Sequence, residues 1–287
     1  MAVSSELRTF KNAAWLGWQM EANWTDPFLF AIYSVVKPLA GTLILVFMYL
    51  VITHGETETM FFSYMYVGNA MYMFVADVLF GVTWVIHDDR EHYMTLKQVY
   101  IAPIKFQTYI FGRAAIKIAI TSFGVLLTLL FGVFILGVDI DFAAMNWPLL
   151  VVSLVLGLAT LAIMGLALGG VTFLTAKHAM GINEGVAGIF FVLSGVIFPI
   201  TILPDWAQSI SKFLPVTYWM EGIRRGLEPG VITALGPTTG LQGFSDLQLL
   251  LILVVTAVAF LFISLGIFRY ADKVARRKGK IDWTSAY

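Results

Sequence analysis

Residues 148–176, PLLVVSLVLGLATLAIMGLALGGVTFLTA, contain no charged side chain. A helix needs about 20 apolar residues to cross the hydrocarbon of a bilayer, because unpaired backbone amides cannot be left in lipid. This stretch therefore predicts a membrane-spanning helix. Stretches of the same character lie at 33–53, 61–86, 114–138, 183–203 and 247–269. We predict an all-α polytopic membrane protein in which residues 1–287 form a single domain with six transmembrane helices.

The composition supports this class and excludes several others. Of the 287 residues, 59% are hydrophobic and 13% are charged, and the formal net charge is zero. A chain without net charge creates no overall electrostatic field that would attract nucleic acid, so we expect no nucleic-acid partner. Cysteine is absent, which excludes disulfides, thiolate metal sites and cysteine nucleophiles. The amino-terminal segment lacks the short apolar core and cleavage site of a removable signal peptide.

The basic residues predict how the chain is oriented. With the amino terminus inside, fifteen fall in cytoplasmic segments: Arg8, Lys11, Lys37, Arg90, Lys97, Lys105, Arg113, Lys117, Lys177, Arg269, Lys273, Arg276, Arg277, Lys278 and Lys280. Only three fall outside: Lys212, Arg224 and Arg225. Because cytoplasmic segments are enriched in Lys and Arg, both termini are predicted to be cytoplasmic.

Two further helices are expected on the cytoplasmic side. Residues 5–22 place Leu7, Phe10, Ala14 and Trp18 on one stripe, which predicts an interfacial helix along the inner leaflet, with a frayed tail as the alternative. Residues 88–103, between the second and third spans, predict an amphipathic helix that Pro103 terminates. Its apolar stripe consists of Tyr93, Leu96, Val99 and Tyr100. That stripe suits a groove on a partner protein or, alternatively, the lipid headgroups.

Residues 204–230 predict a re-entrant hairpin on the outer side. Pro204 and Pro215 divide the chain into pieces at 205–214 and 216–229, both too short to cross a bilayer. One interpretation is that Trp206, Tyr218 and Trp219 anchor the hairpin at the headgroups. The other is an outer gate, in which Glu221 pairs with Arg224 or Arg225 beside Tyr218.

The second span carries the remaining candidate residues. Asp77 lies deep within it, where an ionisable group is a functional candidate unless Asn69 or Thr83 caps it. Tyr72 and Met73 belong to a Met- and Tyr-rich stretch that could line a translocation path or could simply pack against a neighbour. The acidic pair Asp88 and Asp89 is interpreted as the start of a helix. His87 and His92 do not converge around a helix, so no metal site is expected.

Two glycine pairs permit close helix approach. They are Gly165-x-x-x-Gly169 and Gly181-x-x-x-Gly185. Contacts within the chain are the favoured interpretation of both.

Three motifs in order resemble the permeases of type-2 ABC exporters. The first is Asp89-Arg90-Glu91 followed by Thr95-Leu96, Pro103 and Gly112-Arg113. The second is SGVIFPITILPDWAQSISKFLPVTYWMEGIRRGL at 194–227, and the third is FSDLQLL with the basic FRYADKVARRKG that ends the last helix. The family usually has Gly where this chain has Met94, and a residue with a side chain favours a continued helix there.

The resemblance implies a membrane subunit without enzymatic activity in the inner, cytoplasmic membrane. The sequence contains no Gly-x-x-x-x-Gly-Lys-Ser/Thr motif, so ATP and Mg²⁺ are expected on a separate P-loop ATPase subunit. Residues 88–103 would then be the coupling helix, with its apolar stripe on the ATPase and Arg90 and Glu91 in polar contacts. A second permease copy or homologue, membrane lipids and an amphiphilic substrate are also implied. The alternative is a secondary transporter or channel that uses Asp77.

Overall fold

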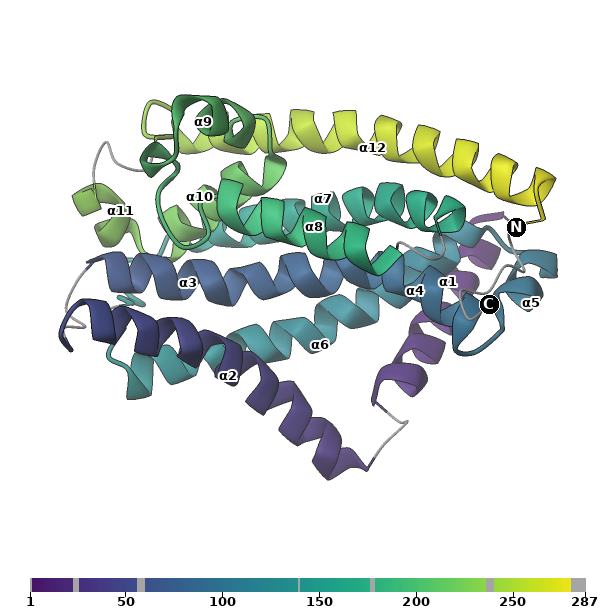
Figure 1. Cartoon of the computed structure of the whole chain (residues 1–287), viewed down its shortest axis with the longest axis horizontal. Coiled ribbons are helices and arrows are strands. Elements are labelled where there is room, and N and C mark those ends of the chain that lie inside the picture. The colour runs from purple at the N-terminus through teal and green to yellow at the C-terminus, as the bar shows by residue number, and fades with distance from the viewer. Residues whose placement is uncertain are drawn as a thin grey trace.

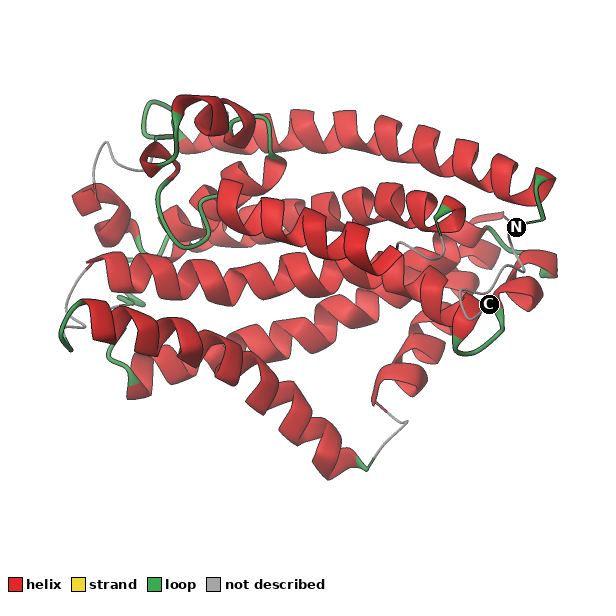
Figure 2. Ribbon diagram, in the orientation of Figure 1, coloured by secondary structure: helices red, strands yellow, loops and turns green. Residues whose placement is uncertain are grey.

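The computed structural model describes residues 2–22, 26–55, 60–138, 140–175, 179–235 and 240–279. These residues are overwhelmingly helical and contain no strand, as Figure 2 shows, so the all-α prediction is confirmed. Lys177 and Lys280, which entered the orientation count, lie outside the described residues. The helices form an elongated bundle whose long members run roughly side by side (Figure 1).

Within the described ranges, five helical stretches are long and apolar enough to cross a bilayer. They are α2 (Pro27–Ile52), the continuous run of α3 (Met60–Phe74), η1 (Val75–Leu79) and α4 (Phe80–Glu91), then α6 (Phe106–Ile135), α7 (Trp147–Leu174) and α12 (Asp246–Arg277). The stretch predicted as a span at 183–203 instead forms α8 (Ala179–Leu193), an irregular segment at 194–199 and the short 3₁₀ helix η3 (Ile200–Ile202). A helix of 15 residues is about 22 Å long, shorter than the roughly 30 Å hydrocarbon layer.

Several helices begin earlier than hydropathy alone predicted. The side chain of Asp26 accepts a hydrogen bond from Phe28 N, so α2 starts at Pro27 rather than at 33. Helix α6 starts at Phe106 rather than at 114. Lys37 and Lys117 lie within membrane-length helices, in agreement with the predicted spans at 33–53 and 114–138, and their cytoplasmic assignment stays a prediction.

The amino-terminal helix α1 (Ala2–Ala22) packs against the start of α6. Small residues make this possible, because a Cβ at Gly112 would lie 2.7 Å from both Ala13 Cβ and Phe10 O. Leu7 and Trp18 of the predicted stripe are exposed on the surface of α1. The frayed-tail alternative is thus wrong, while the position of α1 along a membrane surface stays a prediction.

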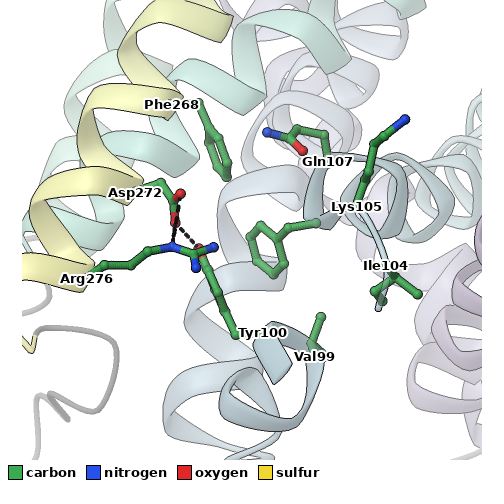
Figure 3. A pocket seen from close by; sticks show the side chains of 9 residues that line it. Val99, Tyr100, Ile104, Lys105, Gln107, Phe268, Asp272 and Arg276 are labelled. Atoms are coloured by element: carbon green, nitrogen blue, oxygen red, sulfur yellow. Dashed lines mark hydrogen bonds and ion pairs between the residues drawn. The ribbon is translucent and has the colours of Figure 1, made fainter. Parts of the chain in front are cut away.

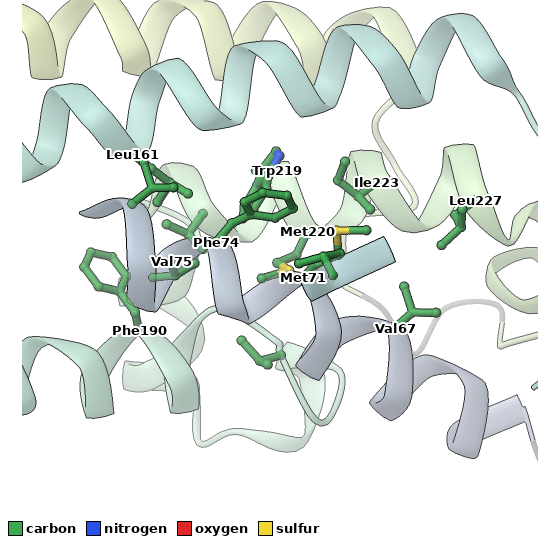
Figure 4. Packing of buried hydrophobic residues seen from close by; sticks show 14 of the residues in the cluster. Val67, Met71, Phe74, Val75, Leu161, Phe190, Trp219, Met220, Ile223 and Leu227 are labelled. Carbon is green, nitrogen blue, oxygen red and sulfur yellow. The ribbon is translucent and has the colours of Figure 1, made fainter. Parts of the chain in front are cut away.

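The main core lies where α10 (Pro215–Leu227) enters the bundle between α3 and α7 (Figure 4). Trp219, only 1% exposed, packs edge-on against Phe74 and fills the space left by the missing side chain of Gly157. The predicted headgroup position of Trp219 is therefore wrong, because the indole is enclosed by protein. Trp206 on α9 (Asp205–Ser211) is exposed.

The two ends of the bundle differ. Helix α5 (Leu96–Ile101), α1 and the carboxy-terminal turns of α12 lie at one end, and α9, α10 and α11 (Pro229–Leu235) lie at the other (Figure 1). The pieces predicted at 205–214 and 216–229 correspond to α9 and α10. Whether they dip into the bilayer stays a prediction.

Candidate functional site

The segment predicted as one helix at 88–103 is two helices joined by a turn. Helix α4 continues to Glu91, residues 92–95 turn, and α5 runs from Leu96 to Ile101. Met94 has φ +50°, the left-handed region that disfavours residues with a Cβ. The turn therefore forms at the position where the family resemblance implied Gly, and the expected continuous helix is corrected.

The apolar stripe of α5 faces the rest of the chain. Leu96 is 2% exposed and packs in a cluster with Ile110 and Phe268 of the neighbouring helices, with Val99 partly buried against it. Tyr100 OH donates a 2.8 Å hydrogen bond to Asp272 of α12 (Figure 3). Burial, reinforced by Asp272, raises the pKa of Tyr100, so the phenol stays protonated as a donor.

Arg276 completes this contact between α5 and α12. Its guanidinium lies 4.7 Å from the centre of the Tyr100 ring, and its Nε is 3.0 Å from Asp272 Oδ1 (Figure 3). The stripe residues Leu96, Val99 and Tyr100 therefore fix α5 to its own bundle. Leu96 is buried, so its predicted packing on an ATPase is wrong. Val99 and Tyr100 are partly exposed on the wall of a pocket of about 210 Å³, so their contact with an ATPase stays a prediction.

Arg90 is also enclosed. Its Nε is 3.2 Å from Glu91 Oε1, and its Nη1 donates a 3.3 Å hydrogen bond to Thr172 O of α7. The prediction that Arg90 contacts a partner directly is therefore wrong, because its side chain is buried. Among the side chains that point outward are Tyr93 and Met94 of the turn with Lys97, Gln98 and Ile101 of α5, and we call this set the α5 outer face.

A buried charge network that the sequence did not predict supports this end of the molecule. Arg113 Nη1 is 3.1 Å from Asp89 Oδ1, and Tyr109 OH donates a 2.8 Å hydrogen bond to Asp89 Oδ2. Since α4 extends past Asp88 and Asp89, these carboxylates lie near its end, and their predicted role at a helix start is wrong. The Asp-Arg-Glu and Gly-Arg motifs contain Asp89 and Arg113, but sequence spacing alone could not show that these two side chains meet between α4 and α6.

At the opposite end, the predicted gate residues have distinct partners. Arg225 Nε is 3.0 Å from Glu221 Oε1, which selects Arg225 from the two predicted partners of Glu221. Arg224 is fully buried and donates to Gly195 O at 2.8 Å, Val196 O at 2.6 Å and Tyr64 O at 3.1 Å. Tyr218 OH donates to Lys212 O at 2.8 Å. The gating role itself stays a prediction.

The three predicted path residues line one cavity. Its volume is about 780 Å³, and Tyr72, Met73 and Asp77 all lie on its wall together with residues of α2 and α6. Asp77 belongs to the five-residue π-helical turn η1, an irregularity that is common at functional sites. Thr121 Oγ1 donates a 2.9 Å hydrogen bond to Asp77 Oδ2. Asn69 instead donates to Thr42, so its predicted capping of Asp77 is wrong.

The glycine pairs have different environments. A Cβ at Gly165 would lie 2.6 Å from Leu79 O, so the predicted contact within the chain is confirmed for Gly165 and Gly169. Gly181 and Gly185 have no heavy atom of the described residues within 4 Å of such a Cβ. The predicted contact within the chain is therefore wrong for this second pair.

The fold and these sites define an α-helical, multi-pass membrane protein with a helical turn clamped to one end of its bundle. The family model described as ABC-2 type transporter matches residues 13–227. The chain therefore belongs to the ABC-2 type transporter family, as a permease component that is not itself catalytic. No curated protein matches the sequence.

Proposed function

We propose that the chain is the permease subunit of an ATP-driven exporter and that ATP is hydrolysed on a separate P-loop ATPase subunit. Family membership supports this proposal, since the sequence has no phosphate-binding loop of its own. A second permease copy or homologue would complete the translocation path. The substrate would be amphiphilic and would move outward or across the bilayer.

The observation that carries the proposal is the α5 outer face. Ile101 is 83% exposed and Met94 is 68% exposed, although both lie on a turn and helix whose inner side is firmly packed. Exposed apolar side chains grouped on a rigid element mark interaction surfaces. Tyr93 and Lys97 lie beside them and would add aromatic and polar contacts with the ATPase.

The proposed orientation places α1, α5 and the basic end of α12 in the cytoplasm, with the chain in the inner membrane. Lys97 belongs to α5 and Lys105 pairs with Glu6 of α1, whereas Lys212 ends α9 and Arg224 belongs to α10. Helices α5 and α1 lie at one end of the bundle, and α9 and α10 lie at the other (Figure 1). This distribution follows the enrichment of basic residues on the cytoplasmic side.

We further propose that α8 and the segment after it together form the sixth span. Their irregular backbone is enclosed by protein, because Arg224 binds the carbonyl oxygens of Gly195 and Val196.

The test is capture of the ATPase by the affinity-tagged full chain from its native membranes. A P-loop ATPase should co-purify, and Ile101→Asp should reduce its recovery by at least about tenfold, because a charge replaces an apolar contact in the interface core. Ile202→Asp is the matched control, since Ile202 is comparably exposed at the opposite end. Recovery of the ATPase that is unchanged by Ile101→Asp, or lost equally in both variants, would refute the contact.

A second candidate is a secondary transporter or channel. The position of Asp77 in a π-helical turn on the wall of a cavity favours it. Transport that continues without any ATPase and ceases with Asp77→Asn when an ion gradient is imposed would establish this alternative.

A further inference from the structure

Two adjoining cavities form one hollow that opens at the surface of the bundle, where Lys37 and Asp77 are exposed. The cavity of about 780 Å³ shares Glu21, Lys37, Ala76, Asp77 and Lys117 with a second cavity of about 610 Å³. The second cavity extends to His92 and Tyr93, in the turn before α5. The hollow therefore leads from the end that bears α5 toward the middle of α2 and α3.

Four of the five shared residues are charged, and two of them neutralise each other. Lys117 Nζ is 2.5 Å from Glu21 Oε1. Asp77 accepts a hydrogen bond from the neutral Thr121 hydroxyl, and neither Asp77 nor Lys37 has an ion-pair partner within 4.0 Å among the described residues. One carboxylate from η1 and one ammonium from α2 thus line the same hollow and attract each other electrostatically, but they form no direct ion pair. Such charges are costly within membrane-length helices.

Beyond this charged region, the walls of the larger cavity are mainly apolar. Tyr33 and Leu45 of α2 line it with Met73 of α3 and Phe191 of α8. Its volume lies in the range of about 300–1,000 Å³ that is typical of small-molecule sites. Aromatic rings and a flexible thioether suit alkyl chains, because they adapt to chains of varied shape.

We propose that this hollow binds a zwitterionic amphiphile. The anionic group of the headgroup pairs with Lys37, the cationic group pairs with Asp77, and the alkyl chain lies along the apolar wall. A headgroup with a single charge satisfies one of these residues and meets a like charge at the other, which disfavours it. This inference names the substrate class of the proposed permease and rests on that function only for the movement of the ligand, since binding itself needs neither ATP nor a partner.

The test uses the full chain, purified in a nonionic detergent and titrated by native mass spectrometry. The probes are three single-chain lipids with the same lauroyl chain and a phosphocholine, phosphoglycerol or trimethylammonium headgroup. Phosphocholine should bind about tenfold more tightly than either singly charged probe. Lys37→Met should shift the preference to trimethylammonium, and Asp77→Asn should shift it to phosphoglycerol.

Lys212→Met is the matched control, because Lys212 is exposed at the far end of the molecule and should leave the order of affinities unchanged. Wild-type preference for either singly charged probe, or an order that neither substitution changes, would overturn the proposal. The nearly isosteric Asp77→Asn variant decides the outcome by itself if Lys37→Met does not fold. Since the assay contains no ATPase, a negative result leaves the proposed ATP-driven function intact.

Discussion

Arg90 and Arg224 use the same chemistry at opposite ends of the bundle. Each is buried, and each donates to backbone carbonyls close to a helix end, Thr172 near the end of α7 and Gly195 and Val196 just after α8. The last carbonyls of a helix lack intrahelical donors, and lipid supplies none. The sequence analysis counted both residues in the orientation of the chain. It predicted that Arg90 contacts an ATPase and that Arg224 is one of two possible partners of Glu221. Their role as backbone donors depends on helix ends that hydropathy does not locate.

Arg224→Ala should therefore destabilise the chain. Two or more buried carbonyls lose their donor, at about 1–3 kcal/mol each, so the expected loss is roughly 3 kcal/mol. Arg224→Lys should restore only part of it, since an ammonium cannot present the planar fork of donors. The thermal unfolding midpoint of the purified chain in detergent measures the effect, with exposed Lys212→Ala as control. A midpoint that Arg224→Ala leaves unaltered would contradict this role.

At the scale of elements, periodicity correctly indicated an apolar stripe before the third long helix, but not the surface that the stripe contacts. Leu96 and Tyr100 pack on α6 and α12 of the same chain, which leaves Met94 and Ile101 outward. A pattern of apolar residues is the same for a helix packed on its own bundle and for one packed on a partner. The turn at Met94 was missed because tertiary contacts outweigh the local preference against a positive φ.

The packing of α1 on α6 should depend on Gly112. A Val at this position would collide with Ala13 and the Phe10 carbonyl, and such overpacking typically costs about 1–3 kcal/mol. Gly112→Val should therefore increase amide hydrogen exchange throughout α1, while exchange in α7 remains as in the wild type. Gly266→Val is the control, because a Cβ at Gly266 in α12 has no described heavy atom within 4 Å. Equal exchange in α1 of both variants would show that the close contact is unimportant.

At the scale of the molecule, the sequence established the membrane class and most of the long helices. The apolar composition of a membrane span follows from its contact with lipid, so the membrane class and the long helices could be predicted from the sequence. The insertion of α10 was not predictable. The sequence alone suggests a headgroup position for Trp219, and only the structure shows that Gly157 of α7 leaves the space that the buried indole fills. The orientation count assigned Lys37 and Lys117 to cytoplasmic segments, although both lie in the predicted spans at 33–53 and 114–138, and it gave no sign that they line the hollow beside Asp77.

The most direct test of the central claim is cross-linking at the α5 outer face. The chain contains no cysteine, so Ile101→Cys introduces a single thiol. In native membranes, a short thiol-to-amine cross-linker should join this variant to a P-loop ATPase, and Ile202→Cys at the other end should give no such product. Two results would contradict the proposed contact between α5 and an ATPase. One is cross-linking by the Ile202→Cys variant but not by the Ile101→Cys variant, and the other is no cross-linking by either variant in membranes that contain the assembled transporter.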